Sequence, residues 1–398
     1  MRVVHISFSD SGGAGLAALR LHEALLEFGV ESYLLCFHKQ SRSVPNVICI
    51  RKPLYIKFLE KLPIRFRNNK YIRFIDLHGK DYECLSFPEA YDCISQHPMI
   101  KKADVINLHW VGSTLNYKSF FQKVQKPIIW TLHDMNPFLG FAHYMGDIQR
   151  NPLDLNLEQR IAQKKAKWIS HSSHLEIVCL CNWMKHYSMQ SDSFRQYPQH
   201  IIRNSVNTQI YKLYNKNYIR SIFNIPNDKY IFLFVSQSVS NPRKGFDILL
   251  EAIKDLDNSC YLMVVGKTVD IDTKANIRFF QTIHDEQLMA LIYSAADAFI
   301  LPSREDNLPN TMLESLCCGT PVITMPTGGM VDIIEDGING IMAKSIDTES
   351  LKDAIHQFIE QFYNFDNEKI SRIAHKFFSP ERQAKEYYML YQSIIKNK

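Results

Sequence analysis

Residues 301–323 read LPSREDNLPNTMLESLCCGTPVI. The apolar residues up to Leu301 predict the end of a buried strand, the acidic segment after them predicts a polar loop, and Asn310 begins a helical pattern. Such a helix directs free backbone N–H groups and the positive end of its dipole at the loop, which favours an anion such as a diphosphate. Glu314, near the first turn, is placed to accept hydrogen bonds from vicinal hydroxyls, and Asp306 on the loop is placed to hold a second polyol.

Short apolar runs alternate with helical patterns on both sides of this segment. The predicted strands cover residues 3–8, 32–37, 105–108, 128–131, 177–180, 230–235, 261–265, 298–301 and 321–324, and the clearest helices cover 245–256, 286–294 and 310–317. This alternation predicts an α/β fold of two doubly wound halves with a cleft between the carboxyl ends of their sheets, near residue 205. We therefore expect an N-terminal domain at 1–205, a second domain at 206–378, and a final helix at 379–398 that packs back on the N-terminal domain.

Composition supports two folded domains in a reducing compartment. The chain has 398 residues, of which 46% are hydrophobic, enough for two cores. Its nine cysteines are scattered rather than arranged as a disulfide framework. The N-terminus lacks the apolar run of a signal peptide, and no segment approaches the length of a membrane span. We expect a cytoplasmic protein whose membrane contact, if any, is peripheral, at the inner face of the plasma membrane.

Basic charge is concentrated between residues 51 and 73. The whole chain carries a formal net charge of +5, yet this stretch alone holds eight basic residues against one acidic residue, interleaved with aliphatic and aromatic side chains. One interpretation is a solvated helix face with a few core anchors; the other is an interfacial segment that binds anionic lipid. A nucleic-acid interface is less favoured, because no nucleic-acid-binding motif accompanies the stretch. The candidate membrane and acceptor patch consists of Lys57, Lys61, Arg65 and Arg67.

The opening segment resembles the retaining, GT-B-fold glycosyltransferases of family 4. Their hallmark is an acidic residue, seven intervening positions, a glutamate, and then a strand that begins with a small residue, Gly, Thr and Pro; here these are Asp306, Glu314 and Cys318-Gly319-Thr320-Pro321-Val322. The resemblance implies two Rossmann-like domains that face each other across a cleft. It also implies that Glu314 binds the ribose hydroxyls of a nucleotide sugar and Asp306 the hydroxyls of the donor hexose. The loop residues that would bind the diphosphate are Asn307, Leu308, Asn310 and Thr311.

Further segments resemble the same family along nearly the whole chain. They are the glycine loop with Gly13 and Gly15, the His133-Asp134 pair, the turn at residues 204–208, the Arg243-Lys244-Gly245 segment, and residues 327–340. By resemblance, the glycine loop approaches the donor phosphate, His133 lies beside the donor sugar, and Lys244 binds the diphosphate. The family usually has an arginine about six residues before this lysine, where Gln237 and Ser238 stand here. Either Arg243 supplies that guanidinium, or Lys244 and the helix dipole act alone. The Asn-Leu-Pro-Asn-Thr loop, in place of the usual Glu-Gly-Phe-Gly-Leu-Pro, is typical of members that assemble polysaccharides.

Plainer interpretations compete with several of these motifs. A glycine loop taken alone often only permits a turn, and a single histidine is more often structural. The pairs Asp255/Asp257 and Asp270/Asp272 resemble metal-binding Asp-x-Asp motifs, but their surroundings favour solvated turns. Residues 171–181 contain His and Cys without the spacing of a zinc site. We therefore expect no metal and no cofactor.

The function that the resemblance implies is transfer of a hexose, with retention, from a nucleotide sugar to a hydroxyl of a lipid-linked saccharide in the synthesis of a cell-surface polysaccharide or lipopolysaccharide. His133, Asp306 and Lys244 are the candidate catalytic residues. One alternative is a GT-B-like sugar epimerase or phosphorylase, although no pyridoxal-phosphate lysine site is evident. The other alternative is a catalytically silent protein that binds nucleotides or carbohydrates.

Overall fold

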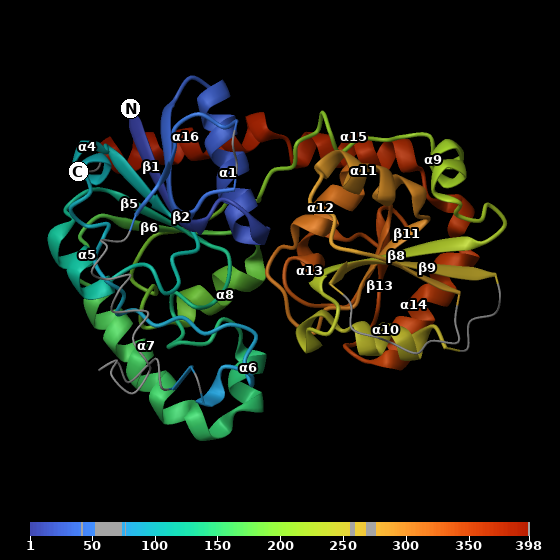
Figure 1. The fold of residues 1–398 in the computed structure, drawn as a ribbon, viewed down its shortest axis with the longest axis horizontal. Coiled ribbons are helices and arrows are strands. Elements are labelled where there is room, and N and C mark those ends of the chain that lie inside the picture. Colours follow the sequence, from blue (N-terminus) through green and yellow to red (C-terminus); the bar gives the residue numbers. More distant parts are fainter. Residues whose placement is uncertain (41–42, 52–73, 76, 255–258, 268–275, 397–398) are drawn as a thin grey trace. The chain divides into compact units, whose positions relative to one another are not determined.

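The computed structural model describes residues 1–398 except 41–42, 52–73, 76, 255–258, 268–275 and 397–398. It divides into two compact units (Figure 1): unit 1 comprises Met1–Ile202 and Ala384–Lys398, and unit 2 comprises Arg203–Gln383. The last helix, α16 (Pro380–Lys396), begins in unit 2 and continues in unit 1. Both units are parallel α/β structures, so the predicted fold class is confirmed.

Unit 1 contains, within its described residues, a seven-stranded parallel sheet in the order β3-β2-β1-β4-β5-β6-β7. Because the order reverses between β1 and β4, the loops after these two strands diverge at a topological switch point, where α/β sheets bind ligands. The elements are β1 (Arg2–Ser9), α1 (Gly12–Glu27), β2 (Glu31–His38), β3 (Val47–Cys49), α4 (Pro98–Lys102), β4 (Val105–Leu108), α5 (Tyr117–Lys123), β5 (Ile128–Leu132), α6 (Met145–Arg150), η2 (Pro152–Asp154), α7 (Leu155–Ile169), β6 (Leu175–Cys179), α8 (Asn182–Gln190) and β7 (Gln199–Ile201).

The core of unit 1 lies on both faces of this sheet, because side chains alternate along each strand. One face carries Val3, Val105 and Ile129, which pack with Leu21 of α1 and Tyr387 of α16. The opposite face belongs to a larger cluster that includes Ile6, Leu108 and Trp130. Burial on two faces explains why the central strands read as continuous apolar runs.

Unit 2 is built, over the part of the chain that the structure describes, on a six-stranded parallel sheet in the order β10-β9-β8-β11-β12-β13. Its switch point lies between β8 and β11. The elements are α9 (Lys216–Phe223), β8 (Tyr230–Ser238), η3 (Pro242–Lys244), α10 (Phe246–Ala252), β9 (Cys260–Lys267), β10 (Ile277–Phe280), α11 (Glu286–Ala295), β11 (Ala298–Leu301), α12 (Asn310–Cys317), β12 (Val322–Thr324), α13 (Met330–Ile333), β13 (Gly340–Met342), α14 (Thr348–Glu360), η4 (Phe362–Asn364) and α15 (Asn367–Phe377).

Several sequence predictions meet the structure directly. The strand at 298–301 and the helix at 310–317 are confirmed as β11 and α12. The helix predicted at 245–256 is shorter, because α10 ends at Ala252. The basic patch Lys57, Lys61, Arg65 and Arg67, and the pairs Asp255/Asp257 and Asp270/Asp272, lie outside the described residues. None of the helices in the described part of the chain is both long and apolar enough to cross a membrane.

Candidate active site

The loops after β8 and β11 meet at the switch point of unit 2. The backbone N–H of Arg304 donates to the carbonyl of Arg243 at 2.8 Å. Gly245 adopts a φ of +70°, and a Cβ there would lie 1.9 Å from the carbonyl oxygen of Pro302. Only glycine fits this turn, because any side chain would collide with the neighbouring loop and strain the backbone. The Lys-Gly pair is therefore held at the carboxyl edge of the sheet.

Asp306 is the centre of a buried charge cluster at this edge. Its side chain accepts from Lys244 Nζ at 2.5 Å and lies 3.3 Å from a guanidinium nitrogen of Arg243. The Ser303 hydroxyl and the backbone N–H of Asn307 also donate to it, at 3.4 and 3.1 Å. Burial alone would raise the pKa of the Asp306 carboxyl, but the charges of Lys244 and Arg243 lower that pKa to about 2. The structure thus brings three of the predicted site residues into direct contact.

The first turn of α12 faces the same loop. Asn307 and Leu308 are buried, and Pro309 stands at the N-cap without a side-chain capping bond. Gly328, at a φ of +56°, leaves room for the carbonyl of Asp306, which a Cβ would approach to 2.0 Å. The side chain of Asn310 accepts from Asn204 at 2.9 Å. The α12 terminus and the two cations therefore form one electropositive edge.

Glu314 lies on the second turn of α12 and is almost completely buried, with 6% of its surface exposed. The Tyr293 hydroxyl of α11 donates to Glu314 Oε2 at 3.2 Å. Burial and the Glu314 charge together raise the pKa of Tyr293 well above its usual value, so this hydroxyl stays a donor. Glu314 therefore has a structural partner as well as its predicted role in recognition.

The glycine turn between β1 and α1 contains Gly13 and Gly15, and the two glycines differ in their surroundings. A Cβ on Gly15 would lie 2.5 Å from the carbonyl oxygen of Ser9, whereas a Cβ on Gly13 would meet nothing within 4 Å. Gly15 is thus required for packing of α1 against β1, and Gly13 borders open space. Of the two, Gly13 is the position that a ligand can approach.

His133 and Asp134 follow β5 at the carboxyl edge of the unit 1 sheet. Asp134 is buried and accepts from Trp110 Nε1 and His143 Nδ1, each at 2.6 Å. Burial would lower the pKa of His143, but Asp134 raises it to about 10, so the pair is ionic. By contrast, burial lowers the pKa of His133 to about 4, so its ring is neutral at physiological pH. The adjacent residues thus differ in role: Asp134 is a structural carboxylate and His133 is a neutral imidazole.

Sequence reasoning missed three contributors to these sites. His143 is the ionic partner of Asp134, and His109 hydrogen-bonds to the His133 ring. Arg304 makes a two-pronged contact with Asp247, at 2.8 and 2.5 Å, which ties the β11 loop to α10. A signal for His109 existed in the sequence, because it follows a buried strand as His133 does.

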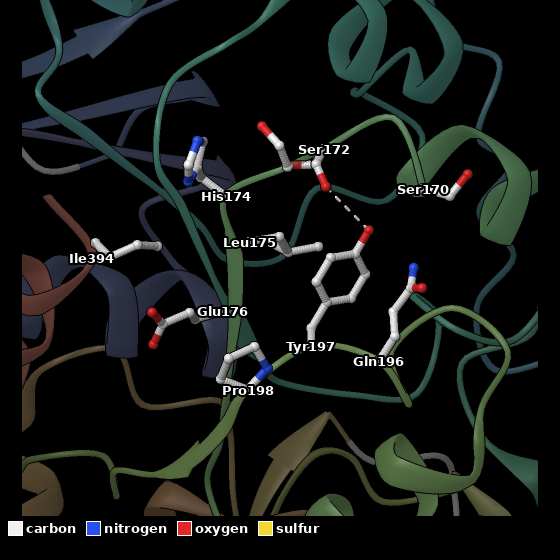
Figure 2. Close-up of a pocket in the computed structure, with 10 residues that line it drawn as sticks. Ser170, Ser172, His174, Leu175, Glu176, Gln196, Tyr197, Pro198 and Ile394 are labelled. Atoms are coloured by element: carbon white, nitrogen blue, oxygen red, sulfur yellow. Dashed lines mark hydrogen bonds between the residues drawn. The ribbon is translucent and has the colours of Figure 1, made fainter. Parts of the chain in front are cut away.

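A polar pocket of about 480 Å³ lies elsewhere in unit 1, at the amino ends of β6 and β7. Figure 2 shows Tyr197 among the residues that line it, with its hydroxyl donating to the carbonyl of Ser172. Ligand sites of parallel sheets lie at the carboxyl ends of the strands. We therefore do not take this pocket as the active site. Among the described residues, no group of three or more His, Cys, Asp or Glu side chains is arranged to hold a metal ion.

The fold as a whole matches solved glycosyltransferase structures of the GT-B class. Sucrose-phosphate synthase from Thermosynechococcus elongatus superposes with a TM-score of 0.69 at 17% identity, over 100% of both chains. The Anabaena protein HepE, in complex with UDP and glucose, superposes with a TM-score of 0.66 at 15% identity, over 99% of this chain and 100% of that one. WaaG, a glycosyltransferase involved in lipopolysaccharide biosynthesis, gives 0.64 at 16% identity, over 96% and 99%.

In the second unit, residues 215–376 match the model of the family described as glycosyl transferases group 1. An uncharacterized glycosyltransferase of Methanocaldococcus jannaschii is 29% identical over 46% of this chain and 49% of its own length. D-inositol 3-phosphate glycosyltransferase of Mycolicibacterium smegmatis is 22% identical over 65% of this chain and 60% of its own length. The chain thus spans 49% and 60% of the length of these two relatives. An uncharacterized 41.2 kDa protein from the cps region of Klebsiella pneumoniae is 21% identical over 99% of this chain and 100% of its own length.

Proposed function

We propose that this protein is a retaining glycosyltransferase that moves a hexose from a nucleotide sugar to a hydroxyl of a saccharide acceptor. The observation that carries the proposal is the electropositive edge of unit 2, where Lys244, Arg243 and the start of α12 converge. A nucleoside diphosphate is the leaving group of such a transfer, and cations with a helix terminus stabilise the charge that develops on it. The family of residues 215–376 and the UDP complex of a structural neighbour support this assignment.

Within this proposal, Asp306 has two tasks. Its buried carboxylate holds Lys244 and Arg243 in place before the donor arrives. When a diphosphate binds, Lys244 shifts its hydrogen bonds toward the phosphate oxygens, which releases one oxygen of Asp306 for a hydroxyl of the donor hexose. Arg243 supplies the guanidinium that the family usually takes from an arginine about six residues before the lysine. Glu314 accepts hydrogen bonds from the ribose, and the reaction needs no metal ion or cofactor.

In unit 1, we assign a part in the transfer step to His133. The sugar develops oxocarbenium character as the diphosphate leaves, and neutral hydrogen-bonding groups beside it stabilise that change without repelling it. His133 is neutral because burial lowers the pKa of its imidazole. Gly13, which borders open space, is the part of the glycine turn that allows close approach of the donor.

We assign the acceptor to the class of lipid-linked saccharides used to build surface polysaccharide or lipopolysaccharide. Two similarities support this class: a relative from a cps region matches the chain nearly end to end, and WaaG, a structural neighbour, is involved in lipopolysaccharide biosynthesis. The rival class, a silent nucleotide- or carbohydrate-binding protein, would bind the donor without turnover. The epimerase or phosphorylase alternative would consume the donor without an acceptor saccharide, or only with phosphate.

A test of the enzymatic proposal is a panel of nucleotide sugars, read by thermal stabilisation and by hydrolysis or transfer. We expect one donor to raise the melting temperature and to be consumed, and Lys244→Met to abolish both effects. Lys254→Met is the matched control, because Lys254 pairs with neighbouring Glu251 and its side chain is 67% exposed. The proposal fails if no nucleotide sugar binds, or if both variants behave alike.

We also propose peripheral contact with an anionic membrane through unit 1. Two large aliphatic side chains of unit 1 are exposed: Leu77 by 77% and Leu153 by 96%. Their segments are joined by the Tyr82 hydroxyl, which donates to Asp154 at 2.8 Å. The basic patch precedes Leu77 in the chain, and this combination of basic and apolar residues suits a lipid interface.

The membrane proposal is tested by sedimentation with vesicles that contain phosphatidylglycerol. We expect the double variant Leu77→Ser, Leu153→Ser to bind less, and reversal of Lys57, Lys61, Arg65 and Arg67 to abolish binding. Tyr363→Ser is the matched control, since Tyr363 is 92% exposed but lies in unit 2. Failure of the unmodified protein to sediment with vesicles would refute this part alone.

A further inference from the structure

Three histidines of unit 1 form a continuous hydrogen-bonded chain. Nδ1 of His5 lies 2.9 Å from Nε2 of His109, and Nδ1 of His109 lies 3.0 Å from Nε2 of His133. The ring centroids are 5.2 and 5.3 Å apart along the chain, so each imidazole also packs against the next. The chain runs from the interior of β1 to the candidate catalytic residue after β5.

These histidines lie on one face of the sheet, where the side chains change in a regular order from apolar to polar along three neighbouring strands. At the amino end this face carries Val3, Val105 and Ile129, which are apolar. Two residues further along each strand stand His5, Asn107 and Thr131, and two further still stand Ser7, His109 and His133. The face therefore changes from apolar to polar toward the edge where α/β sheets bind ligands.

Specific hydrogen bonds link the middle of this polar region to the final helix. Thr131 donates to Asn107 at 3.0 Å, and Asn107 donates to the Tyr391 hydroxyl at 2.7 Å. Burying such groups carries a penalty that hydrogen bonds offset only when nearly all of them are made. Apolar side chains at these positions would avoid that penalty. We therefore expect the three histidines to have a functional role in addition to packing.

Each imidazole in the chain is neutral, because burial lowers the pKa of all three. A neutral imidazole carries one N–H and one acceptor nitrogen, so the hydrogen bonds must all point in the same direction along the chain. In one direction His5 donates to His109 and His109 donates to His133. In the other direction His133 donates to His109, and His109 donates to His5.

The environment of His5, at one end of the three histidines, selects between the two directions of hydrogen bonding. Nε2 of His5 is buried, and none of the described residues forms a hydrogen bond with it. If His133 were the donor, this nitrogen would carry a buried N–H without an acceptor, which is rare in proteins. If His5 is the donor, the same nitrogen is a bare lone pair, which is less unfavourable. His133 then accepts at Nε2, and its proton resides on Nδ1.

We propose that His5 and His109 are positioning residues that lock His133 as the Nδ1–H tautomer. The nitrogen that carries the proton in a histidine is set by the hydrogen bond that the other nitrogen makes, and here a buried donor occupies Nε2. The catalytic consequence rests on the proposed function: His133 offers an N–H, from a fixed ring, during sugar transfer. With the opposite tautomer the same atom would be an acceptor and would repel a lone pair.

The structural half of the proposal is tested without any substrate. Protein labelled with ¹⁵N-histidine distinguishes protonated from unprotonated ring nitrogens, and the His133 signals are assigned by their loss in His133→Gln. We expect Nδ1 of His133 to be protonated in the unmodified protein, and the Nε2–H form to emerge in His109→Phe. A His133 that already carries its proton on Nε2 in the unmodified protein overturns the proposal.

The catalytic half is tested by turnover of the donor found in the nucleotide-sugar panel. Partners that orient a metal-bound imidazole through its other nitrogen are worth about 10- to 100-fold in activity. By analogy, we expect kcat of His109→Phe to fall by a similar factor while KM for the donor holds. His22→Gln is the matched control, because His22 is also buried and packs edge-on against the His5 ring, but its hydrogen bonds go to Ser32 and Pro45. An unchanged kcat in His109→Phe overturns this half. If no donor is turned over while the tautomer is as expected, the proposed function fails and the positioning role stands.

Discussion

Replacement of Asp306 by asparagine tests the charge cluster of unit 2 most directly. The Asp306 side chain is 8% exposed, and the pKa of its carboxyl lies at about 2 against an ordinary value of 3.8. A depression of nearly two units corresponds to about 2 kcal/mol of unfolding free energy that depends on the ionised form. Asp306→Asn leaves Arg243 and Lys244 beside a neutral amide, so we expect unit 2 to lose at least this amount at pH 7.

The sign of the pH dependence follows from the depressed pKa. The stabilisation is fully present above the unfolded-state pKa, near 4, and is lost as the pH falls toward 2. The difference between the unmodified protein and Asp306→Asn should therefore be constant from pH 7 to pH 5 and should shrink below pH 4. A destabilisation that persists undiminished at pH 3 would show that packing, rather than charge, explains the effect.

Hydrogen exchange followed by mass spectrometry is the suitable assay, because it reports β8 and β11 separately from unit 1. All four tryptophans, at 110, 130, 168 and 183, lie in unit 1, so their fluorescence during urea unfolding serves as an internal reference. Asp247→Asn is the matched control, since Asp247 also pairs with an arginine but its side chain is 66% exposed. Exposed pairs contribute about 0–1 kcal/mol. Equal losses in the two variants would refute the reasoning.

Three further predictions concern other parts of the two units. Glu314→Gln should weaken nucleotide-sugar binding about 10- to 100-fold by calorimetry, because hydrogen bonds to a charged group contribute about 1.5–3 kcal/mol. The melting temperature of this variant should not change, since the amide oxygen still accepts from Tyr293. Unchanged affinity would contradict the assignment of Glu314 to the donor site. Gly15→Ala should lower the melting temperature by several degrees, because its Cβ would lie 2.5 Å from a carbonyl oxygen, whereas Gly13→Ala should be neutral or stabilising; similar losses in both would disprove the packing argument. The raised pKa of His143, about 10, implies a stabilising contribution that is fully present below pH 6.5 and is lost as the pH rises toward 10; urea titrations should show this slope in the unmodified protein and not in His143→Gln.

The strongest sequence patterns predicted the elements that carry the site. The β11 strand and α12 helix are as predicted, because a buried apolar run, a polar loop and a helical start signal act locally. The short strands β3, β7, β10 and β13 were not predicted. They have three or four residues each, and such strands exist because a neighbouring strand pairs with them.

Side-chain partners were harder to predict than elements. The sequence placed Asp306 and Lys244 in the candidate site, yet their ion pair joins loops 62 positions apart and depends on the switch point that brings β8 and β11 together. The histidine chain could have been found, because His5, His109 and His133 continue the period-two pattern of buried strands. Which nitrogen bonds to which is a property of the packed sheet alone.

The final helix also constrains when unit 1 can finish folding. Tyr387 and Tyr391 are buried in its core. Their hydroxyls form hydrogen bonds with Thr131 and Asn107, respectively, on the sheet. During synthesis, the first 202 residues therefore leave the ribosome with part of one sheet face uncovered, and it stays so until unit 2 and residues 384–396 have been made. Synthesis of unit 1 begins first, but its folding is completed last. A nascent chain halted inside unit 2 should therefore expose apolar surface and recruit chaperones.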